Sequence, residues 1–258
     1  MGKLPPLLVL CGGLGTRLKE LALDRPKSLV PVLGKPFLYH QLALFQKQGF
    51  SEVVLVAGHL ASQISEYLSQ VEADGLFPAL HVSIYDEGPE RLGTGLALLK
   101  ALESSELAGG AELPGGAPCI AVTYGDSYLD FDVLSAFEAF KHEGKAALMT
   151  VTDKLQGHRP NCSVEGSMVL QYSKAPDVHG LSFIDYGLSF YKVDELRQAG
   201  AELTGLAQRT VGSCALDLGA IQAYLARRRE MAACLVELPF FEVGSIEGIA
   251  ALCAYLQN

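Results

Sequence analysis

Apolar runs of five to seven residues alternate with helix-patterned segments through residue 153, and this alternation constrains the fold most. The predicted strands are LLVLC (7–11), EVVLVA (52–57), LHVSIY (80–85), CIAVTY (119–124) and AALMTVT (146–152). The segments between them that predict helices are 35–49, 60–71, 93–104 and 131–144. Near-continuous apolar strands that alternate with helices indicate a parallel sheet covered on both faces.

The second half of the chain has a different pattern. Shorter alternating stretches at 161–173 and 182–191 predict an antiparallel β insertion. Helical stretches at 216–229 and 245–256 flank a last predicted strand near 234–243. We therefore expect one mixed, mainly parallel α/β domain with a β-rich second half.

Composition excludes several classes of protein. A net charge of -9 argues against nucleic-acid binding and against an anionic membrane surface as partner. No apolar stretch is long enough to span a membrane, and two prolines break the short N-terminal apolar run, so we expect no signal peptide. The six cysteines form no C-x-x-C pair, which predicts buried reduced thiols. We expect a cytoplasmic protein.

Positive charge is nevertheless concentrated near the N-terminus. Residues 1–35 contain Lys3, Arg17, Lys19, Arg25, Lys27 and Lys35 against only Glu20 and Asp24. Such a local cationic segment on an acidic protein indicates a small anionic ligand.

Gly12, Gly13 and Gly15 directly follow the first predicted strand. Ligands of open parallel sheets bind beyond the carboxyl ends of strands, and glycines there let backbone N–H groups approach phosphate oxygens. A tight surface turn is the alternative, but it does not account for Arg17.

The two common phosphate loops do not match this stretch. A dinucleotide fingerprint needs a third glycine, which GLGTRL (13–18) lacks, and an acid where the chain has Ala57-Gly58-His59. A Walker loop needs Ser or Thr after its lysine, but Gly34-Lys35 is followed by Pro36.

GGLGTRL (12–18) with the later Arg25-Pro26-Lys27 instead resembles the G-G-x-G-T-R-L…P-K signature of sugar-1-phosphate nucleotidyltransferases. Four more stretches match that family in its order: LGTG (92–95), YGDSYLD (124–130), IDYGLSFY (184–191) and FFEVGSIEG (240–248). The resemblance is nearest to short single-domain members such as heptose-1-phosphate guanylyltransferases. It implies a Rossmann-like, GT-A-like domain over 1–258. Its NTP-binding half would be about 1–153, and its sugar-phosphate-binding half, with a β-rich sugar-binding insertion, about 154–258.

The resemblance also implies the reaction, in which a sugar-1-phosphate oxygen attacks the α-phosphorus of an NTP and pyrophosphate leaves. Arg17, Lys27 and Asp126 would be the catalytic residues, because this chemistry needs alignment and charge neutralisation more than a nucleophilic side chain. The residues implied to bind nucleotide are Leu10, Gly12, Gly13, Gly15, Thr16, His59, Gly93, Thr94 and Gly125. A side chain at Gly93 would block the base. For His59, the alternative to a contact with the base or ribose is a purely structural role.

The acceptor and metal sites follow from the same resemblance. Asn161 and Asp185 would contact sugar hydroxyls and Lys174 the sugar phosphate, with a solvated loop lysine as the alternative for Lys174. Asp126 and Glu242 would bind Mg²⁺, although Glu242 stands where the family commonly has aspartate.

Two other functions remain open. Asp130-Phe131-Asp132 is a D-x-D motif, as in glycosyltransferases that use an NDP-sugar, although capping of the helix that follows is the favoured interpretation. A catalytically silent nucleotide-sugar-binding regulatory protein is the second alternative. The base of the NTP, the phosphorylated acceptor and the oligomeric state, including a homo-oligomer, are not predicted.

Overall fold

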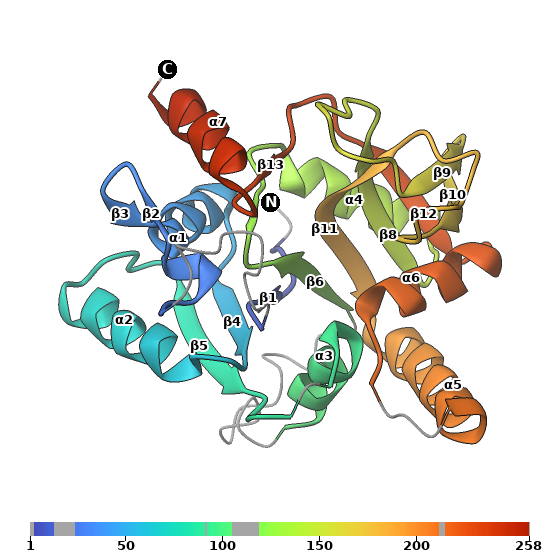
Figure 1. The fold of residues 1–258 in the computed structure, drawn as a ribbon, viewed down its shortest axis with the longest axis horizontal. Coiled ribbons are helices and arrows are strands. Elements are labelled where there is room, and N and C mark those ends of the chain that lie inside the picture. Colours follow the sequence, from blue (N-terminus) through green and yellow to red (C-terminus); the bar gives the residue numbers. More distant parts are fainter. Residues whose placement is uncertain (1–2, 13–23, 91, 105–118, 212–214, 258) are drawn as a thin grey trace.

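The computed structural model describes residues 3–257 apart from 13–23, 91, 105–118 and 212–214. The strands of its main sheet are β1 Leu7–Leu10, β4 Glu52–Ala57, β5 His81–Asp86, β6 Cys119–Tyr124, β8 Ala147–Thr152, β9 Cys162–Glu165, β10 Met168–Tyr172, β11 Ile184–Lys192 and β12 Met231–Leu235. Within the described residues they form a nine-stranded sheet in the order β5-β4-β1-β6-β11-β8-β12-β10-β9 (Figure 1). Two small pairs accompany it, β2 (Pro31–Val32) with β3 (Lys35–Pro36), and β7 (Ser127–Tyr128) with β13 (Phe241–Glu242).

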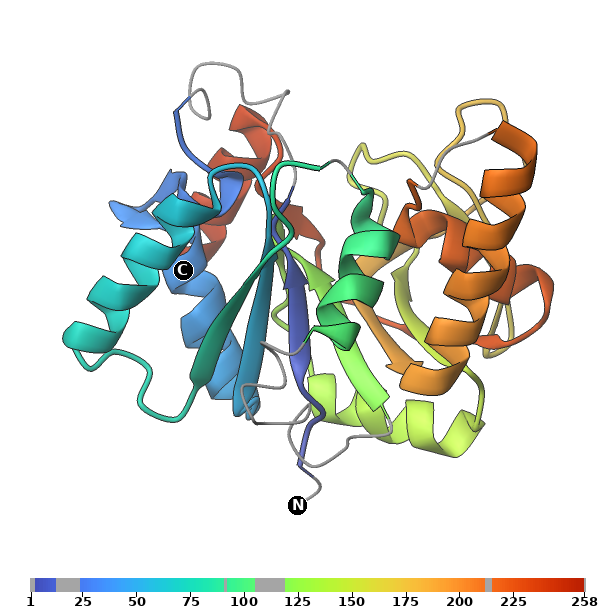
Figure 2. The same cartoon turned by 90° about the horizontal axis from the view of Figure 1, so that it is seen from below.

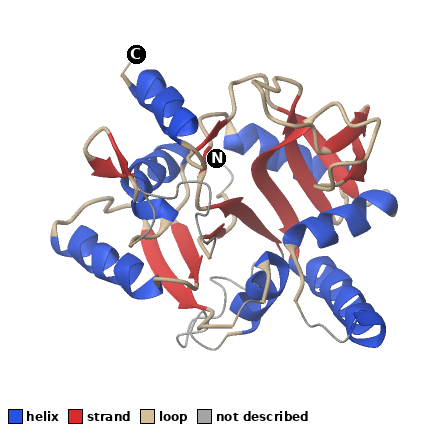
Figure 3. Cartoon of the chain, in the orientation of Figure 1, coloured by secondary structure: helices blue, strands red, loops and turns tan. Residues whose placement is uncertain are grey.

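Helices cover both faces of this sheet, as Figure 2 shows from the side and Figure 3 by element type. The described helices are α1 Phe37–Gln48, α2 Ala61–Ala73, α3 Thr94–Glu103, α4 Val133–Glu143, α5 Val193–Val211, α6 Leu218–Arg227 and α7 Ile246–Leu256, with a short 3-10 helix, η2, at Lys27–Leu29. Buried side chains of α3, α5 and α6 pack on one face, and those of α1, α2 and α4 on the other. The expected α/β class and mainly parallel sheet are confirmed.

The strands expected in the first half are also confirmed. β1 pairs in parallel with β4 on one side and β6 on the other, and β4 pairs in parallel with β5. The helix expected over 35–49 ends as predicted, because Gly49 adopts a left-handed φ of +92° that a side chain would disfavour. The last strand of the sheet begins earlier than the expected 234–243, at Met231.

The stretch expected at 182–191 is antiparallel, but it does not lie in an insertion. β11 runs between β6 and β8, antiparallel to both, at the centre of the sheet. All but the last of its nine residues are buried. The second half of the chain therefore completes the same sheet that the first half begins, and only β9 and β10 form the outlying antiparallel part.

Helix α5 was not predicted. Its sequence is polar, and two glycines interrupt it, which hides the narrow apolar stripe of Leu196, Ala199 and Leu203. One of these glycines has a packing reason: a Cβ atom on Gly200 would lie 2.3 Å from Cδ1 of Leu99 in α3. The bare backbone of α5 thus lets it approach α3 closely.

Two expectations from composition can be compared with the described residues. Five of the six cysteines are free there, and Cys214 lies outside the described part. None of the described helices combines the length and the apolar character that crossing a bilayer requires.

Because β11 lies at the centre of the sheet, we expect that shortening one of its buried side chains lowers stability strongly. Phe190 is fully buried and stacks on Phe140 of α4 at a centroid distance of 5.8 Å. Phe190→Ala should lower the free energy of unfolding by about 3–5 kcal/mol, measured by denaturant titration. The control Leu235→Ala, 53% exposed at the end of β12, should cost well under half as much. Equal losses would contradict a buried central β11.

Candidate active site

The larger of two cavities relevant to ligand binding has a volume of about 680 Å³. It opens beyond the carboxyl ends of β1, β4 and β5 and beside the start of α3, the edge where parallel sheets bind ligands. Five predicted nucleotide-binding residues line it, namely Leu10, Gly12, His59, Gly93 and Thr94. The structure therefore brings together residues from three segments that lie far apart in the sequence.

Gly93 has no room for a side chain, for a reason that the sequence did not indicate. Its φ is +79°, and an added Cβ atom would lie 2.7 Å from the carbonyl oxygen of Leu216. Thr94 fixes the same contact, because its Oγ1 accepts a 3.0 Å hydrogen bond from the N–H of Leu218. The LGTG stretch thus anchors α3 to the segment before α6 and so shapes one wall of the cavity.

Gly125 acts at the neighbouring strand end. Its N–H donates a 2.9 Å hydrogen bond to the carbonyl of Leu10, and an added Cβ atom would lie 2.9 Å from Sγ of Cys11. A side chain at this position would push the end of β6 away from β1. Gly125 therefore keeps the segments after β1 and β6 together.

The smaller cavity, of about 380 Å³, lies beyond β6 and beside β9, β10 and β11. All the predicted acceptor and metal residues line it: Asp126, Asn161, Lys174, Asp185 and Glu242. They come from segments up to 116 residues apart in sequence, from Asp126 to Glu242, so the fold and not sequence proximity gathers them.

An ion pair links this cavity to the segment after the glycine-rich stretch. Nζ of Lys27, at the start of η2, lies 3.0 Å from Oδ2 of Asp126, and the two side chains are only 16% and 22% exposed. Partial burial makes this pair more than a surface contact, because removal of either partner leaves a poorly solvated charge. Two residues predicted to be catalytic are thus in direct contact.

Other cations of the N-terminal segment are engaged elsewhere. Lys3 pairs with Glu52 at 3.2 Å, and Nζ of Lys35 lies 3.8 Å from the ring centroid of Tyr39. The local charge seen in the sequence is therefore distributed over several contacts. Gly13, Gly15, Thr16 and Arg17 lie outside the described residues.

Glu242 reaches the smaller cavity through the pairing of β13 with β7. Glu242 stands opposite Ser127, and the N–H of Val243 donates a 2.7 Å hydrogen bond to the carbonyl of Asp126. The two predicted metal ligands therefore come from adjacent backbone segments and face one cavity. The described residues contain no group of three or more acidic, histidine or cysteine side chains placed to hold a metal ion, so a metal here would need further oxygens from a substrate or water.

Asp185 is a buried acid at the floor of the smaller cavity, 8% exposed. Its carboxylate accepts hydrogen bonds from the N–H of Gly187 at 2.9 Å and from Nε2 of Gln222 at 3.3 Å. Burial raises the pKa of Asp185, while the N–H of Gly187 and the charge of Lys174 act in the opposite direction. Asn161 is coupled to it, because its Oδ1 accepts a 2.8 Å hydrogen bond from the backbone N–H of Asp185.

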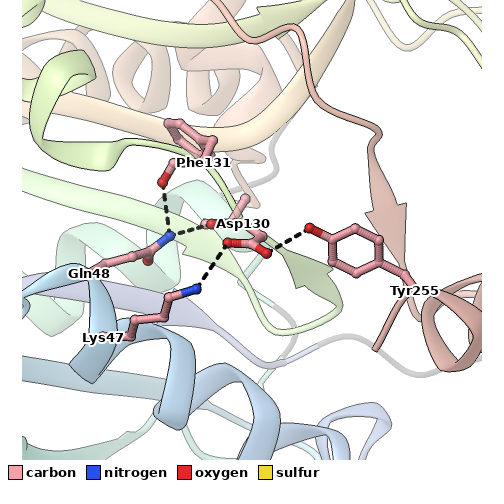
Figure 4. A network of polar contacts seen from close by, with 6 residues as sticks. Lys47, Gln48, Asp130, Phe131 and Tyr255 are labelled. Carbon is pink, nitrogen blue, oxygen red and sulfur yellow. Dashed lines mark hydrogen bonds and ion pairs between the residues drawn. The ribbon is translucent and has the colours of Figure 1, made fainter. Parts of the chain in front are cut away.

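The D-x-D motif is used for structure. Oδ1 of Asp132 accepts a 3.1 Å hydrogen bond from the N–H of Ser135 and so caps α4, as the sequence favoured. Asp130 accepts a 2.7 Å hydrogen bond from Tyr255 of α7 and lies 3.8 Å from Nζ of Lys47 (Figure 4). Both acids have partners outside the two cavities, which removes the observation that supported the glycosyltransferase alternative.

Comparison with known families decides the assignment. The profile of the MobA-like NTP transferase domain matches residues 7–185, which include the glycine-rich stretch, Lys27, Asp126 and Asp185. This chain belongs to the MobA-like NTP transferase family. The resemblance found in the sequence is thereby confirmed, and the larger cavity of this NTP transferase lies within the matched region apart from Asp217.

Relatives of the NTP transferase carry names from sugar-nucleotide synthesis. A probable glucose-1-phosphate cytidylyltransferase of Bacillus subtilis is 25% identical over 190 residues, which cover 67% of this chain and 70% of that protein. The D-glycero-alpha-D-manno-heptose 1-phosphate guanylyltransferase of Campylobacter jejuni is 38% identical over 96 residues, which cover 37% of this chain and 41% of that protein. The matches thus span between two fifths and about two thirds of these relatives' own lengths.

Solved structures match over nearly the whole chain. HddC of Yersinia pseudotuberculosis, solved in complex with GMP-PN, has a TM-score of 0.73 at 21% identity, over 98% of this chain and 100% of that one. A UDP-glucose pyrophosphorylase solved with UDP-glucose has a TM-score of 0.74 at 15% identity, over 98% and 99%. At such identities the match establishes the fold of the NTP transferase.

The cap assigned to Asp132 predicts an effect on stability and none on chemistry. Asp132→Ala should lower the free energy of unfolding by about 1 kcal/mol and leave nucleotidyl transfer intact. The control Glu138→Ala removes an exposed acid of the same helix that pairs with Lys141 at 2.7 Å, and it should lower the free energy of unfolding by less. Loss of activity in a stably folded Asp132→Ala variant would return the D-x-D motif to the active site.

Proposed function

We propose that this chain is a Mg²⁺-dependent nucleotidyltransferase that joins an NTP to a sugar-1-phosphate and releases pyrophosphate. The observation that carries the proposal is the smaller cavity, where five residues implied by the family pattern line one space and Lys27 lies 3.0 Å from one of them. A cavity with two cations and several carboxylates suits phosphate oxygens, sugar hydroxyls and a hard metal ion together.

The larger cavity would hold the nucleoside part of the NTP. Its walls include apolar side chains that a planar base can lie against, namely Leu10, Val56, Leu92 and Ala97. Gly12, at its edge, begins the stretch whose backbone N–H groups would cradle the triphosphate, with Gly13, Gly15, Thr16 and Arg17 as the remaining proposed contacts. His59 lines the same cavity and would contact the ribose or the base.

The smaller cavity would hold the acceptor. Lys174 would bind the sugar phosphate as a point charge, and Asn161 and Asp185 would bind sugar hydroxyls. The hydrogen bonds that hold the Asp185 carboxylate from both sides fix its position before a substrate arrives. A preorganised acceptor of hydrogen bonds selects hydroxyl groups over an apolar or anionic substituent.

The reaction would be an in-line displacement at the α-phosphorus. The oxygen of the acceptor phosphate forms the new P–O bond, and the bond to the pyrophosphate oxygen breaks with its electron pair. Lys27 would move from Asp126 toward the phosphate oxygens and neutralise charge on them, while Asp126 and Glu242 hold the metal. Mg²⁺, when bound, supplies further charge neutralisation on the phosphate oxygens.

The two substrates would bind to different halves of the chain. Residues 1–153 would provide most of the NTP site and residues 154–258 most of the acceptor site, within one domain. Four lining residues cross this division, because Asp217 lines the larger cavity and Tyr124, Asp126 and Ser127 line the smaller one. The two halves would therefore act together, as one sheet joins them.

The proposal predicts pyrophosphate release in a matrix of four NTPs and a panel of sugar-1-phosphates and other phosphorylated acceptors. At least one pair should give an NDP-linked product with Mg²⁺ and none without a divalent metal. Lys27→Ala should lower kcat about 100-fold or more, because it removes a cation from the reacting phosphates. Lys47→Ala is the matched control, since it breaks another lysine–aspartate pair, at 3.8 Å, outside both cavities. Binding of nucleotides without turnover across the panel would instead support a regulatory protein.

The metal ligands have a separate test. Asp126→Asn should abolish Mg²⁺-dependent turnover and weaken Mn²⁺ binding in the presence of NTP, as measured by electron paramagnetic resonance. Glu242→Gln should raise the Mg²⁺ concentration required for half-maximal rate, because one of two carboxylate ligands is neutralised. Glu165→Gln, a change in an exposed acid of β9, is the control. An unchanged metal requirement in Glu242→Gln would limit the proposed ligand set to Asp126.

A further inference from the structure

We propose that Gln41 is a positioning residue for the transfer reaction, because its side-chain amide holds the turn that carries Asp126. This inference rests on the proposed function, which makes Asp126 a catalytic residue and a metal ligand. Gln41 is not among the residues that line either cavity, so it would act through Asp126 and not on a substrate. The sequence did not indicate Gln41, since one polar residue among the apolar positions of a helix is an ordinary pattern.

The amide of Gln41 bridges the two ends of this turn. β6 ends at Tyr124 and β7 begins at Ser127, so Gly125 and Asp126 form the connection between them. Nε2 of Gln41 donates hydrogen bonds to the carbonyl oxygens of Tyr124 at 3.2 Å and of Ser127 at 2.9 Å. One side chain thus uses both of its N–H groups to fix the chain directly before and directly after Gly125 and Asp126.

The surroundings of Gln41 are those of a core residue. Its side chain is completely buried, and so are the apolar Leu38, Leu42 and Phe45 of the same helix. Within the described part of the chain, Oε1 of Gln41 has no hydrogen-bond partner. An apolar side chain of similar size would avoid the cost of burying that oxygen. The two bonds to the turn of Asp126 are therefore what a glutamine supplies at this position.

Helix α1 also holds the other member of the Lys27–Asp126 pair. η2 begins at Lys27, and the carbonyl of Val30, at its end, accepts a 2.9 Å hydrogen bond from the N–H of Phe37, the first residue of α1. Phe37 and Gln41 stand about one helical turn apart. Both segments that meet in the 3.0 Å ion pair are thus tied to the start of one helix, which sets the distance between the cation and the carboxylate.

Two backbone hydrogen bonds hold the same turn from other sides. The N–H of Gly125 donates to the carbonyl of Leu10 at 2.9 Å, and the N–H of Val243 donates to the carbonyl of Asp126 at 2.7 Å. A substitution of Gln41 removes its tether and leaves the atoms of these two bonds in place. The turn should then stay attached to its neighbours but lose its fixed position against α1. A misplacement of about 1 Å at reacting groups is enough to lower the rate of an aligned transfer strongly.

Gln48 provides a matched control in the same helix. Its Nε2 also donates to two backbone carbonyls, those of Leu129 and of Phe131, the latter at 3.3 Å (Figure 4). These carbonyls belong to the segment between β7 and α4, beyond the turn of Asp126. A comparison of the two glutamines therefore separates the position of the tether from the loss of a side-chain amide as such.

The experiment compares the wild type, Gln41→Met and Gln48→Met, because methionine is similar in length and donates no hydrogen bond. Gln41→Met should lower kcat about 10- to 100-fold with the NTP and acceptor that the wild type turns over fastest. It should also raise the Mg²⁺ concentration required for half-maximal rate. The KM of the acceptor should stay within about twofold, because Asn161 and Lys174 come from other segments. Gln48→Met should leave all three quantities within about twofold of the wild type.

A second measurement needs no turnover. Because the N–H of Val243 donates to the carbonyl of Asp126, its hydrogen exchange, followed by NMR, reports on the turn. Gln41→Met should speed this exchange about tenfold or more, whereas Gln48→Met should not change it. Gln41→Met should also weaken the binding of Mn²⁺ in the presence of each of the four NTPs, measured by electron paramagnetic resonance without acceptor. Denaturant titration ensures that both variants are compared where they are fully folded.

Two results would overturn the role of Gln41: a Gln41→Met variant with the kcat and metal requirement of the wild type, or equal losses in Gln41→Met and Gln48→Met. If Gln41→Met does not fold, Gln41→Glu replaces it, because glutamate keeps the shape of the side chain and lacks the amide protons. Failure of both to fold beside a folded Gln48→Met would reject the positioning role and make Gln41 a residue of general stability.

Failure of the proposed function is a different outcome. If no NTP is turned over with any acceptor, that function is wrong, and the hydrogen exchange of Val243 still decides whether Gln41 holds the turn of Asp126.

Discussion

The parallel pairing of β1 between β4 and β6 is the constraint on which both cavities depend. β1 is buried along its whole length, and its two neighbours run in the same direction, so three strand ends meet at one edge of the sheet. Backbone hydrogen bonds continue past the strands, from Cys11 to Val56 at 2.7 Å and from Gly125 to Leu10 at 2.9 Å. The segments that carry polar residues must therefore leave the sheet side by side.

A second constraint acts across that edge. The Lys27–Asp126 pair joins the segment after β1 to the segment after β6, 99 residues apart. Both side chains are largely shielded from water, so the pair is costly to break unless other charges replace the partners. In the proposed reaction, phosphate oxygens would replace Asp126 beside Lys27, and a metal ion would replace Lys27 beside Asp126.

The sequence predicted the elements better than their places. Apolar runs identified the first-half strands, and Pro36 and Gly49 the limits of α1, because these signals are local. The apolar pattern of 184–192 would be the same whether the strand lay in an insertion or at the centre of a sheet. Only the pairing of strands in the folded chain shows that β11 lies between β6 and β8. The motifs likewise named Lys27 and Asp126 separately, but their 3.0 Å contact exists only once the segments after β1 and β6 leave the sheet side by side.

The two cavities differ in the charge of the side chains that line them. Asp86, Glu87, Glu90 and Asp217 line the larger cavity without a lysine or arginine among the described lining residues. The smaller cavity is lined by two cations, Arg159 and Lys174, beside Asp126, Asp185 and Glu242, and Lys27 contacts its Asp126. A triphosphate that entered in the reverse direction would place its anionic end among four carboxylates. Coulomb repulsion in a partly desolvated space grows as the effective dielectric constant falls, so that orientation is disfavoured before any specific contact forms. An overall charge of -9 adds nothing to attract a nucleotide, which leaves binding to depend on this local separation of charge and on the backbone around Gly12.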